Sequence, residues 1–402
     1  MITVDVWLFL LVFCSIAIGW WLGHRAGIKT GTGSADATFH PEYYKGLNYL
    51  LSDRPDGELD SFISSLEVNT ETLETHISIG NLMRRKGEVE RAIRIHQNLL
   101  ARPSLPREHL HRAHLELARD FISAGLLDRA ERLLEDLLVE APELQAIARR
   151  HLLEIYQDEK EWEKAIAAAK QLRPKKSLLK AKPPEDKSIV VTMAHYCCEL
   201  AEISIAAKDF TTARSHLKHA LNCDPQCVRA SLLMAKIEHT TKHYDKAIKA
   251  LRKVRNQDIS LVTETLPLLK STYHEMGDDQ GFFDYLADCL KVYPSSAIML
   301  ALVEDLQSRQ DDEAAASFLG TELKRRPSLR GLAKLVELHM SYSSDPAKGN
   351  LGLLQMLIKQ LMLSKAQYQC QHCGFSGKHM HWLCPGCKEW GQIKPIRGAE
   401  GD

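Results

Sequence analysis

The sequence predicts an all-α fold, in which a superhelix of repeated helix pairs follows one N-terminal transmembrane helix and precedes a small C-terminal metal-binding domain. Three observations predict it: an uncharged apolar run near the amino end, alanines at repeat spacing through the middle, and two C-x-x-C pairs near the carboxyl end. A length of 402 residues exceeds that of one ordinary domain, so a repeat array or several folding units are expected.

The composition is that of a globular protein without excess charge. Lys+Arg and Asp+Glu number 52 each, and 45% of the residues are hydrophobic, which argues against disorder. A net charge of zero disfavours a protein whose whole surface binds one polyanion such as nucleic acid. Ten cysteines are too few for a disulfide scaffold of this length, so a reducing compartment is expected.

The apolar run Val6–Gly23 has eighteen residues without a charge, which in a helix span roughly 27 Å, close to the thickness of a bilayer core. Only Asp5 is charged before the run, so the basic n-region of a cleaved signal peptide is missing. Arg25, Lys29 and Lys45 follow it, which by the positive-inside rule places the body of the protein in the cytoplasm. The alternative is a buried core helix, which an unbroken, non-amphipathic run disfavours.

The middle of the chain repeats a pattern of a small residue, an apolar or aromatic residue three later and an alanine twelve later. The five segments that follow the pattern, with polar residues at two of the middle positions, are Gly80/Met83/Ala92, Ala118/Phe121/Ala130, Leu153/Tyr156/Ala165, Ala201/Ser204/Ala213 and Ala235/Glu238/Ala247. Three more are readable around Tyr49/Phe62, Tyr273/Phe282/Leu286 and Leu306/Ala315/Leu319, and prolines at 142, 225, 294 and 327 end several units. Spacings of 38, 35, 48 and 34 residues match the tetratricopeptide repeat better than a non-repeating helical bundle.

Two stretches of the array differ in charge from the rest. The segment 173–187 has six basic residues, two acidic residues and three prolines, which predicts a solvated linker, with anionic lipid headgroups as the alternative contact. Residues 256–288 have a net charge of −6, which predicts an acidic surface. The expected organisation is therefore a transmembrane anchor (1–24), a flexible tether (25–40), N-terminal repeats (41–172), a basic linker (173–187), C-terminal repeats (188–364) and a metal-binding domain (365–402).

The two C-x-x-C pairs predict one structural metal ion. Cys370, Cys373, Cys384 and Cys387 offer four thiolates, which suits a tetrahedral site for zinc or iron. The alternative of two redox pairs lacks the strand and helix setting of a thioredoxin. Gly374 and Gly386 should permit tight turns that bring amides toward the sulfurs, and Trp382 and Trp390 are expected to cover the site. We expect the nearby histidines to lie on the surface or to hydrogen-bond to the metal ligands without binding the ion; they are His372, His379 and His381. We expect the remaining cysteines to be small apolar packing residues; they are Cys14, Cys197, Cys198, Cys223, Cys227 and Cys289.

No catalytic or cofactor-binding residue is predicted. The sequence has no G-x-S-x-G, H-E-x-x-H or Walker A motif, and four cysteine ligands would leave a metal ion no open position for water. Stacked helix pairs instead offer a concave surface for binding other proteins.

Together, the anchor, the repeats and a rubredoxin-like terminus resemble the lipopolysaccharide assembly protein B family of Gram-negative bacteria over essentially the whole chain. Two stretches resemble that family in amino-acid sequence, namely YYKGLNYLLSDRPDGELDSFISSLEVN and GNLMRRKGEVERAIRIHQNLLARP. The resemblance implies a single-pass inner-membrane adaptor that promotes turnover of the lipid A pathway deacetylase by the membrane protease FtsH, and that an inner-membrane regulator restrains. Lipopolysaccharide-export proteins are further expected partners, and self-association stays open.

The resemblance also carries the metal ligands over to Cys370, Cys373, Cys384 and Cys387. The sequence departs from the usual knuckle at Lys388, where a glycine commonly follows the last cysteine, so the hydrogen bonds of the second turn are in doubt. The main alternative function is a general tetratricopeptide adaptor for chaperone or assembly work at the membrane. The C-x-x-C pairs are also compatible with an iron electron-transfer domain or a nucleic-acid-binding zinc ribbon.

Overall fold

The computed structural model describes residues 73–101, 105–173, 187–363 and 365–398, and residues 15, 17, 20 and 21 near the amino end. Helices fill most of these ranges, and a small three-stranded sheet follows them. The chain divides into two compact units, residues 1–120 and residues 121–402.

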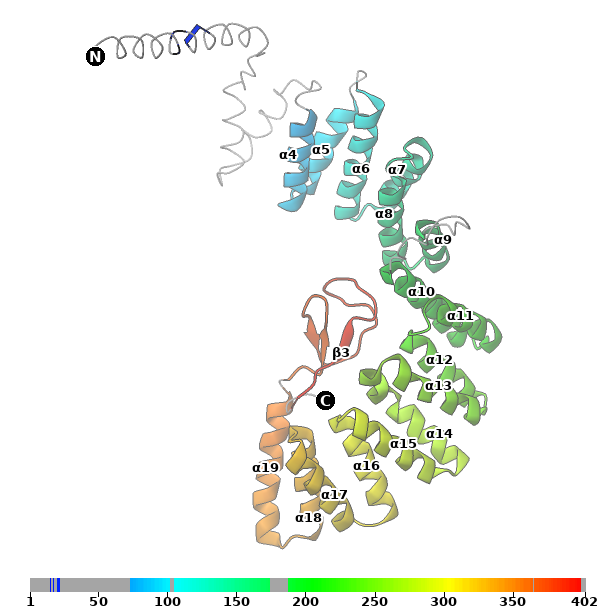
Figure 1. Ribbon diagram of the computed structural model, residues 1–402, viewed down its shortest axis with the longest axis vertical. Coiled ribbons are helices and arrows are strands. Elements are labelled where there is room, and N and C mark those ends of the chain that lie inside the picture. The colour runs from blue at the N-terminus through cyan, green and yellow to red at the C-terminus, as the bar shows by residue number, and fades with distance from the viewer. Residues whose placement is uncertain are drawn as a thin grey trace, which may run out of the picture. The chain divides into compact units, whose positions relative to one another are not determined.

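The described helices follow one another in antiparallel pairs, which Figure 1 shows from blue to orange in chain order. Those that begin in the first unit are α4 (Leu73–Arg85), α5 (Val89–Leu100) and α6 (Arg107–Ser123). Those of the second unit are α7 (Leu127–Glu140), α8 (Gln145–Asp158), α9 (Trp162–Leu172), α10 (Lys187–Ala206), α11 (Phe210–Cys223), α12 (Val228–Thr240), α13 (Tyr244–Gln257), the 3₁₀ helix η1 (Ile259–Thr265), α14 (Leu266–Met276), α15 (Asp279–Val292), α16 (Ser296–Arg309), α17 (Asp312–Arg325), α18 (Leu329–Tyr342) and α19 (Asp345–Leu363).

The repeat prediction is confirmed, because the small residues of the pattern lie where helices pack most closely. The template alanines at positions 92, 118, 130, 165, 201, 213, 235 and 247 are all fully buried. At Gly80 a Cβ atom would lie 2.5 Å from the imidazole ring of His96, so only glycine fits between α4 and α5. One more pair, α18 and α19, follows the units that the pattern identifies.

Two template positions hold polar residues, and the side chain of each forms a hydrogen bond. Glu238 is buried, and Arg214 of the preceding pair donates to it at 2.7 Å. This hydrogen bond lowers the pKa of Glu238, so its carboxylate stays charged. The hydroxyl of Ser204 donates to the carbonyl of Leu200 one turn earlier.

Prolines and capping residues set the helix boundaries. Helices α7, α11, α15 and α17 each end two residues before a proline, at Pro142, Pro225, Pro294 and Pro327 as the sequence predicts. Five α-helices of the described ranges begin with a side chain that accepts a hydrogen bond from the first turn, and the capping residues are Asp209, Asp278, Ser295, Asp311 and Ser328.

The turn inside each of the first six pairs that the structure describes contains one residue with positive φ. It is glycine in three turns, at Gly87, Gly125 and Gly277, and lysine in the other three, at Lys160, Lys208 and Lys242, with φ of 61°, 62° and 63°. The three lysines are exposed, and their Cβ atoms make this left-handed conformation unfavourable. The array therefore carries local backbone strain at these three turns.

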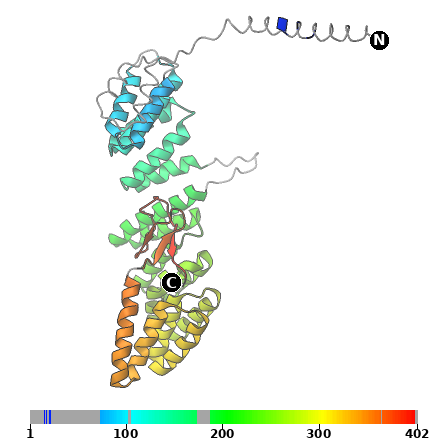
Figure 2. The same cartoon turned by 90° about the vertical axis from the view of Figure 1, so that its left-hand side faces the viewer.

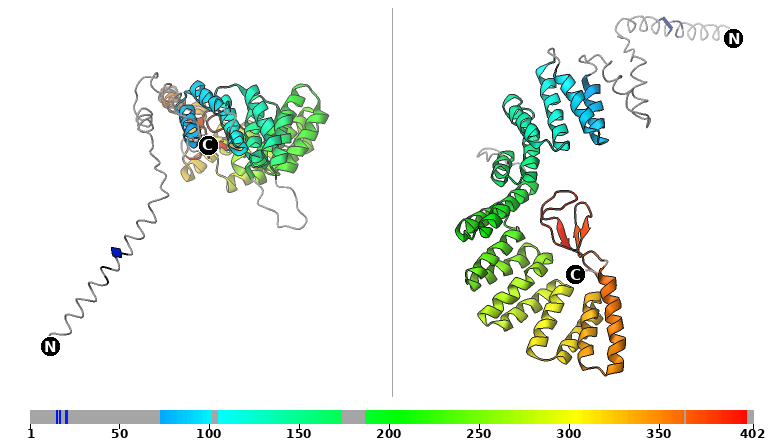
Figure 3. Two further views of the ribbon diagram at one scale, coloured as in Figure 1. Left: turned by 90° about the horizontal axis from the view of Figure 1, so that it is seen from above. Right: turned by 180° about the vertical axis from the view of Figure 1, so that it is seen from behind.

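Within the second unit, the helix pairs stack along a curve and the C-terminal domain lies on its inner side (Figures 1 and 3). Figure 2 shows the strands of this domain in front of the green helices. The domain is an antiparallel sheet of order β2-β1-β3, formed by β1 (Tyr368–Cys370), β2 (Ser376–Gly377) and β3 (Ile393–Pro395). Tyr368 pairs with Gly377 on one side and with Pro395 on the other.

Helix α10 is long and apolar enough to cross a bilayer, and it is the helix among the described residues that meets this criterion. It packs against α9, α11 and α12, and 44% of its most apolar window is buried. Tyr196 and Met193, at its centre, are each 1% exposed. We therefore interpret α10 as a core helix of the array.

The predicted membrane anchor lies mostly outside the described residues. Within it, Ser15, Ala17, Trp20 and Trp21 are helical and exposed, and the anchor stays a prediction. The tether, the unit around Tyr49/Phe62 and the linker residues 174–186 also lie outside the described ranges.

Replacing Lys160, Lys208 and Lys242 together with glycine should raise the thermal stability of the array. Glycine adopts positive φ without a Cβ clash, and we expect a gain of about 0.5–1 kcal/mol per site after its greater unfolded-state entropy is subtracted. Circular dichroism melting of the purified chain measures the change. Lys249→Gly, in the middle of α13, is the control and should cost about 1 kcal/mol. A triple variant that melts at or below the parent would contradict the strain at these turns.

Candidate metal centre

The four cysteines of the two C-x-x-C pairs come together in the structure. Cys370 ends β1, Cys373 lies in the turn that follows, and Cys384 and Cys387 lie in a second turn between β2 and β3. All four sulfur atoms lie within 4.8 Å of one another. The Sγ atoms of Cys370 and Cys387 are 3.8 Å apart, and those of Cys373 and Cys384 are 3.6 Å apart.

These distances fit one tetrahedral ion. Zinc–thiolate bonds of about 2.3 Å place the sulfurs of a tetrahedral site about 3.8 Å apart. Both sulfur–sulfur distances are close to this value, and thiolates also suit iron. The donor set can therefore hold one structural metal ion, zinc or iron.

The two turns have the same backbone conformation, although one contains glycine and the other lysine. The amide of Gly374 donates to the carbonyl of Cys370 at 3.0 Å, and the amide of Lys388 donates to that of Cys384 at 2.9 Å. Both residues have positive φ, 79° for Gly374 and 56° for Lys388. The doubt about the second turn is thereby resolved, because Lys388 adopts the conformation that glycine usually supplies.

Backbone amides also point at the sulfurs, as the glycines predict. Burial raises the pKa of Cys370, but hydrogen bonds from the amides of Cys373 and His372 outweigh it and lower the pKa to about 7. The amide of Glu389 also donates to the sulfur of Cys387, but burial and the neighbouring thiols outweigh it and raise the pKa of Cys387. A Cβ atom at Gly386 would lie 3.3 Å from the sulfur of Cys373, so a small residue is needed there.

The apolar cover of the cysteines differs from the one expected. The side chains packed against Cys370 and Cys384 are those of Tyr368, Phe375, Met380 and Ile393. The two tryptophans pack against the repeats instead: Trp390 reaches α9 and α10, and Trp382 reaches α10 and the core of the following pairs. The prediction that they cover the metal site was wrong, because both serve a contact between domains that spacing alone does not reveal.

Trp390 sits in a pocket between α8, α9 and α10 and is 4% exposed. Its ring stacks on His195 with centroids 4.9 Å apart and meets Tyr196 edge-on at 6.0 Å. Its indole nitrogen donates to the Oε1 atom of Gln157 at 2.8 Å, and the Tyr196 hydroxyl donates to the same oxygen at 3.0 Å. We call this group of Gln157, Trp162, His195, Tyr196 and Trp390 the tryptophan seat.

The tryptophan seat is electrically neutral at its centre. Burial lowers the pKa of His195 to about 3, with Arg229 and Lys394 adding to the effect, so the imidazole is uncharged at neutral pH. The Arg229 guanidinium lies 5.7 Å from the Trp390 ring, and Glu199 and Glu202 pair with it at 2.8 and 3.0 Å. Gly391 has a φ of 67°, and a Cβ there would lie 3.2 Å from His195, so the backbone before β3 passes close to α10.

Three further polar contacts join the metal domain to acidic residues of the repeats. Lys388 binds Asp158 at the end of α8, with Nζ 2.7 and 2.8 Å from the two carboxylate oxygens. Lys394 binds Asp258 at 2.5 Å, and the Tyr368 hydroxyl donates to Glu264 at 2.8 Å. Asp258 and Glu264 belong to the acidic stretch 256–288, so part of that surface meets the chain's own metal domain.

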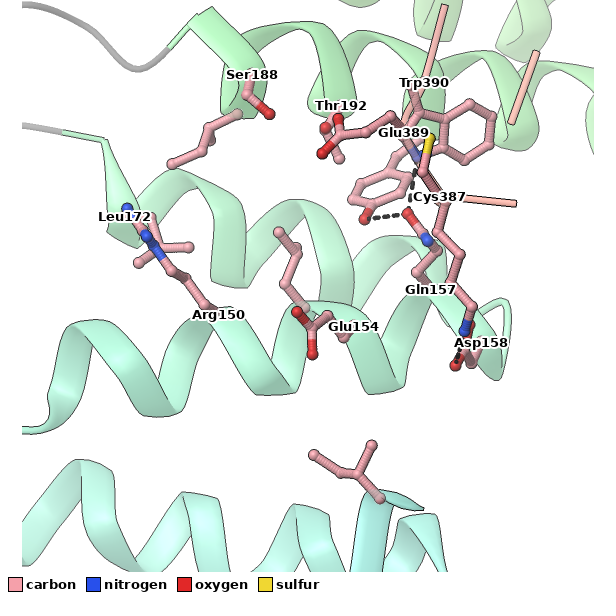
Figure 4. Close-up of a pocket in the computed structure, with 15 residues that line it drawn as sticks. Arg150, Glu154, Gln157, Asp158, Leu172, Ser188, Thr192, Cys387, Glu389 and Trp390 are labelled. Atoms are coloured by element: carbon pink, nitrogen blue, oxygen red, sulfur yellow. Dashed lines mark hydrogen bonds and ion pairs between the residues drawn. The ribbon is translucent and has the colours of Figure 1, made fainter. Parts of the chain in front are cut away.

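A hollow of about 430 Å³ lies beside these contacts, with walls from both domains (Figure 4). One wall is α8, with Arg150 and Glu154, and another is the start of α10, with Ser188 and Thr192. The metal domain supplies the third wall through residues 387–390. The hollow therefore exists only while the metal domain is docked.

The histidines near the metal centre and most of the cysteines outside it lie where the sequence predicts. His372, His379 and His381 are exposed, which fits surface residues. Of the remaining cysteines, 197, 198, 227 and 289 are buried, Cys223 is half-buried, and Cys14 lies outside the described residues. Sequence reasoning missed the repeat side of the docking surface, because residues such as Gln157 and His195 carry no motif and lie about 200 residues away from Trp390.

Trp390→Ala should detach the metal domain from the repeats without loss of metal. The indole fills the seat but is absent from the cover of the cysteines, and truncating a buried tryptophan costs about 3–5 kcal/mol. Limited proteolysis should then cleave near residues 364–367, while elemental analysis finds one metal ion per chain as before. The control is His381→Ala, an exposed residue of the same domain. Simultaneous loss of metal would show that the indole stabilises the metal site itself.

Two family models match parts of this chain. A family described as rubredoxin metal binding domain matches residues 368–395, and a tetratricopeptide repeat family matches residues 204–258. A repeat protein of solved structure from Parabacteroides merdae is 16% identical, with a TM-score of 0.33, and covers 71% of this chain and 99% of its own.

Two relatives match over nearly their full length. Lipopolysaccharide assembly protein B of Escherichia coli K12 is 35% identical over 395 residues, which are 98% of this chain and 99% of that protein. Lipopolysaccharide assembly protein B of Haemophilus influenzae is 33% identical over 402 residues, which are 98% of each chain. The chain thus belongs to the lipopolysaccharide assembly protein B family.

Proposed function

We propose that this protein is a membrane-anchored adaptor of lipopolysaccharide assembly, which presents the lipid A pathway deacetylase to an FtsH-type membrane protease. The observation that carries the proposal is the metal domain docked on the inner side of the repeats, where the two domains together wall one hollow. A surface built from two domains suits recognition of another protein. The names of the full-length relatives supply the pathway.

In this proposal Cys370, Cys373, Cys384 and Cys387 hold one zinc or iron ion. The ion supplies a cross-link between the two turns, and the short segment around them has little other core. The four thiolates fill a tetrahedral site, so the ion binds no substrate. Its function is to keep Trp390 and Lys388 positioned against α8 and α10.

The anchor has a separate function in the proposal. A helix at residues 6–23 would keep the adaptor, the protease and a membrane regulator in one plane of the inner membrane. Confinement raises their effective concentration, so that weak contacts suffice. The repeats and the metal domain would then face the cytoplasm, where the deacetylase is expected.

Replacing Cys384 and Cys387 together with serine should remove the metal and leave the deacetylase undegraded. Without thiolates the second turn cannot hold the ion, so the seat and the hollow lose the wall that the metal domain supplies. Elemental analysis of the purified chain and the half-life of the deacetylase in cells measure the two effects. Cys223→Ser, a half-buried cysteine outside the metal domain, is the matched control.

Normal turnover of the deacetylase in the metal-free variant would contradict the proposal. Slow turnover in the Cys223→Ser control would mean that the effect is not specific to the metal domain. A protein level equal to the parent's, checked by immunoblot, separates lost function from lost protein.

A further inference from the structure

Two cysteines and one histidine outside the metal centre meet where helices α10 and α11 pack against each other (Figure 1). The Nδ1 atom of His219 lies 3.1 Å from the sulfur of Cys197 and 3.7 Å from the sulfur of Cys223. Both sulfur atoms therefore face the same ring nitrogen, and both cysteines are free thiols. We call Cys197, His219 and Cys223 the thiol site.

The two cysteines of the thiol site differ in exposure and in charge. Cys223 is the last residue of α11 and is half-buried, whereas Cys197 lies near the middle of α10 and is 1% exposed. Interaction with the Cys197 thiol lowers the pKa of Cys223 to about 7, and the cations Arg173 and Lys170 add to this effect. The same interaction and burial raise the pKa of Cys197. One thiol is therefore accessible and readily ionised, while its neighbour is buried and protonated.

The imidazole of His219 is placed to accept the proton of the buried thiol. Burial lowers the pKa of His219, and the nearby cations Lys170 and Arg173 lower it further, so the ring is neutral at neutral pH. With its proton on Nε2, the neutral ring has a lone pair on Nδ1, the atom that lies 3.1 Å from the Cys197 sulfur. A base at this distance can convert a protonated thiol into a nucleophile.

We propose that Cys223 and Cys197 form a dithiol that a hydroperoxide, such as hydrogen peroxide, oxidises to a disulfide between α11 and α10. In the first step the Cys223 thiolate attacks one peroxide oxygen, so that an S–O bond forms, the O–O bond breaks and hydroxide leaves. In the second step His219 takes the proton of Cys197, and the Cys197 sulfur attacks that of Cys223. An S–S bond forms, the S–O bond breaks and a second hydroxide leaves. The two hydroxides take up the two thiol protons, so two thiols lose two electrons and the peroxide becomes two water molecules.

The position of Cys223 at a helix end suits the movement that the second step requires. The sulfur atoms of a disulfide are about 2.05 Å apart, closer than two free thiols come, so one side chain has to move. Cys223 ends α11, and the next residue, Asp224, has extended backbone angles. A helix end has fewer hydrogen bonds to break than a helix centre, so Cys223 can move while Cys197 stays in place.

A second pair of thiols lies nearby but is closed to solvent. The sulfur atoms of Cys198 and Cys227 are 3.9 Å apart, and these residues are 0% and 4% exposed. A peroxide reaches the half-buried Cys223 more easily than either of them. We therefore interpret Cys198 and Cys227 as packing residues, as the sequence predicts, and Cys223 as the residue that oxidation reaches first.

The thiol site goes beyond the proposed adaptor function. Cys197 follows Tyr196 directly in α10, so the disulfide would form on the helix that carries part of the tryptophan seat. Its chemistry uses the residues of α10 and α11 and an added peroxide, and it needs neither the deacetylase nor the protease. The site therefore gives the repeats a sensitivity to peroxide that is separate from recognition.

The test treats the full chain, with metal bound and in phosphatidylcholine nanodiscs, with hydrogen peroxide. After the free thiols are blocked, trypsin releases Cys197 and Cys198 on one peptide, residues 188–208, and Cys223 and Cys227 on another, residues 219–229. Mass spectrometry measures the fraction of these two peptides that a disulfide joins. We expect this fraction to rise with peroxide and to return to its starting value when dithiothreitol is added.

Variants identify the two sulfur atoms that react. Cys223→Ser and Cys197→Ser should each lower the joined fraction at least about ten-fold, because each removes one partner of the disulfide. In the Cys197→Ser chain the sulfenic acid on Cys223 has no thiol to attack it, so dimedone should label Cys223. His219→Gln should slow the joining. Cys198→Ala with Cys227→Ala is the matched control and should leave the joined fraction unchanged, and circular dichroism melting checks that each variant folds.

Joined peptides that disappear in the Cys198→Ala and Cys227→Ala control would show that the buried pair is oxidised instead, and would overturn the inference. Overoxidation of Cys223 to sulfinic acid in the parent chain without joined peptides would overturn it as well. The peptides are measured without the deacetylase or the protease, so failure of this inference is distinct from failure of the proposed function.

Discussion

The fit of one indole ring between α8, α9 and α10 joins parts of the chain that are 195 to 233 residues apart. Trp390 has a stacking partner in His195, a hydrogen-bond acceptor in Gln157 and a cation nearby in Arg229. Because His195 is neutral, the stack does not bury an extra charge. The hollow beside α8 depends on this contact.

The zero net charge of the chain conceals two complementary surfaces. The metal domain is basic, the stretch 256–288 is acidic, and Lys394 and Tyr368 bind Asp258 and Glu264 between the two domains. These contacts are half-buried, so water screens them in part, and their effect is mainly to orient the domain. The buried indole of Trp390 contributes most to holding the metal domain on the repeats, and the charged contacts fix the orientation of the domain.

The sequence predicts the local features of this protein well and its long-range contacts poorly. The alanine spacing located five helix pairs and the prolines located four helix ends, because both act within one or two turns of chain. The C-x-x-C spacing identified the four cysteines that converge, since each knuckle is a local turn. Trp390 was assigned to the wrong surface, because its partners lie on helices that only the folded array brings near.

The central claim is that a metal-held domain keeps the inner surface of the repeats in its binding form. Hydrogen–deuterium exchange of the full chain, with and without a metal chelator, tests it most directly. The account predicts that metal removal raises exchange in α8 and the first half of α10, where the domain docks, and leaves α11 unchanged. Protection that stays the same in α8 and α10 after the metal has left would contradict it.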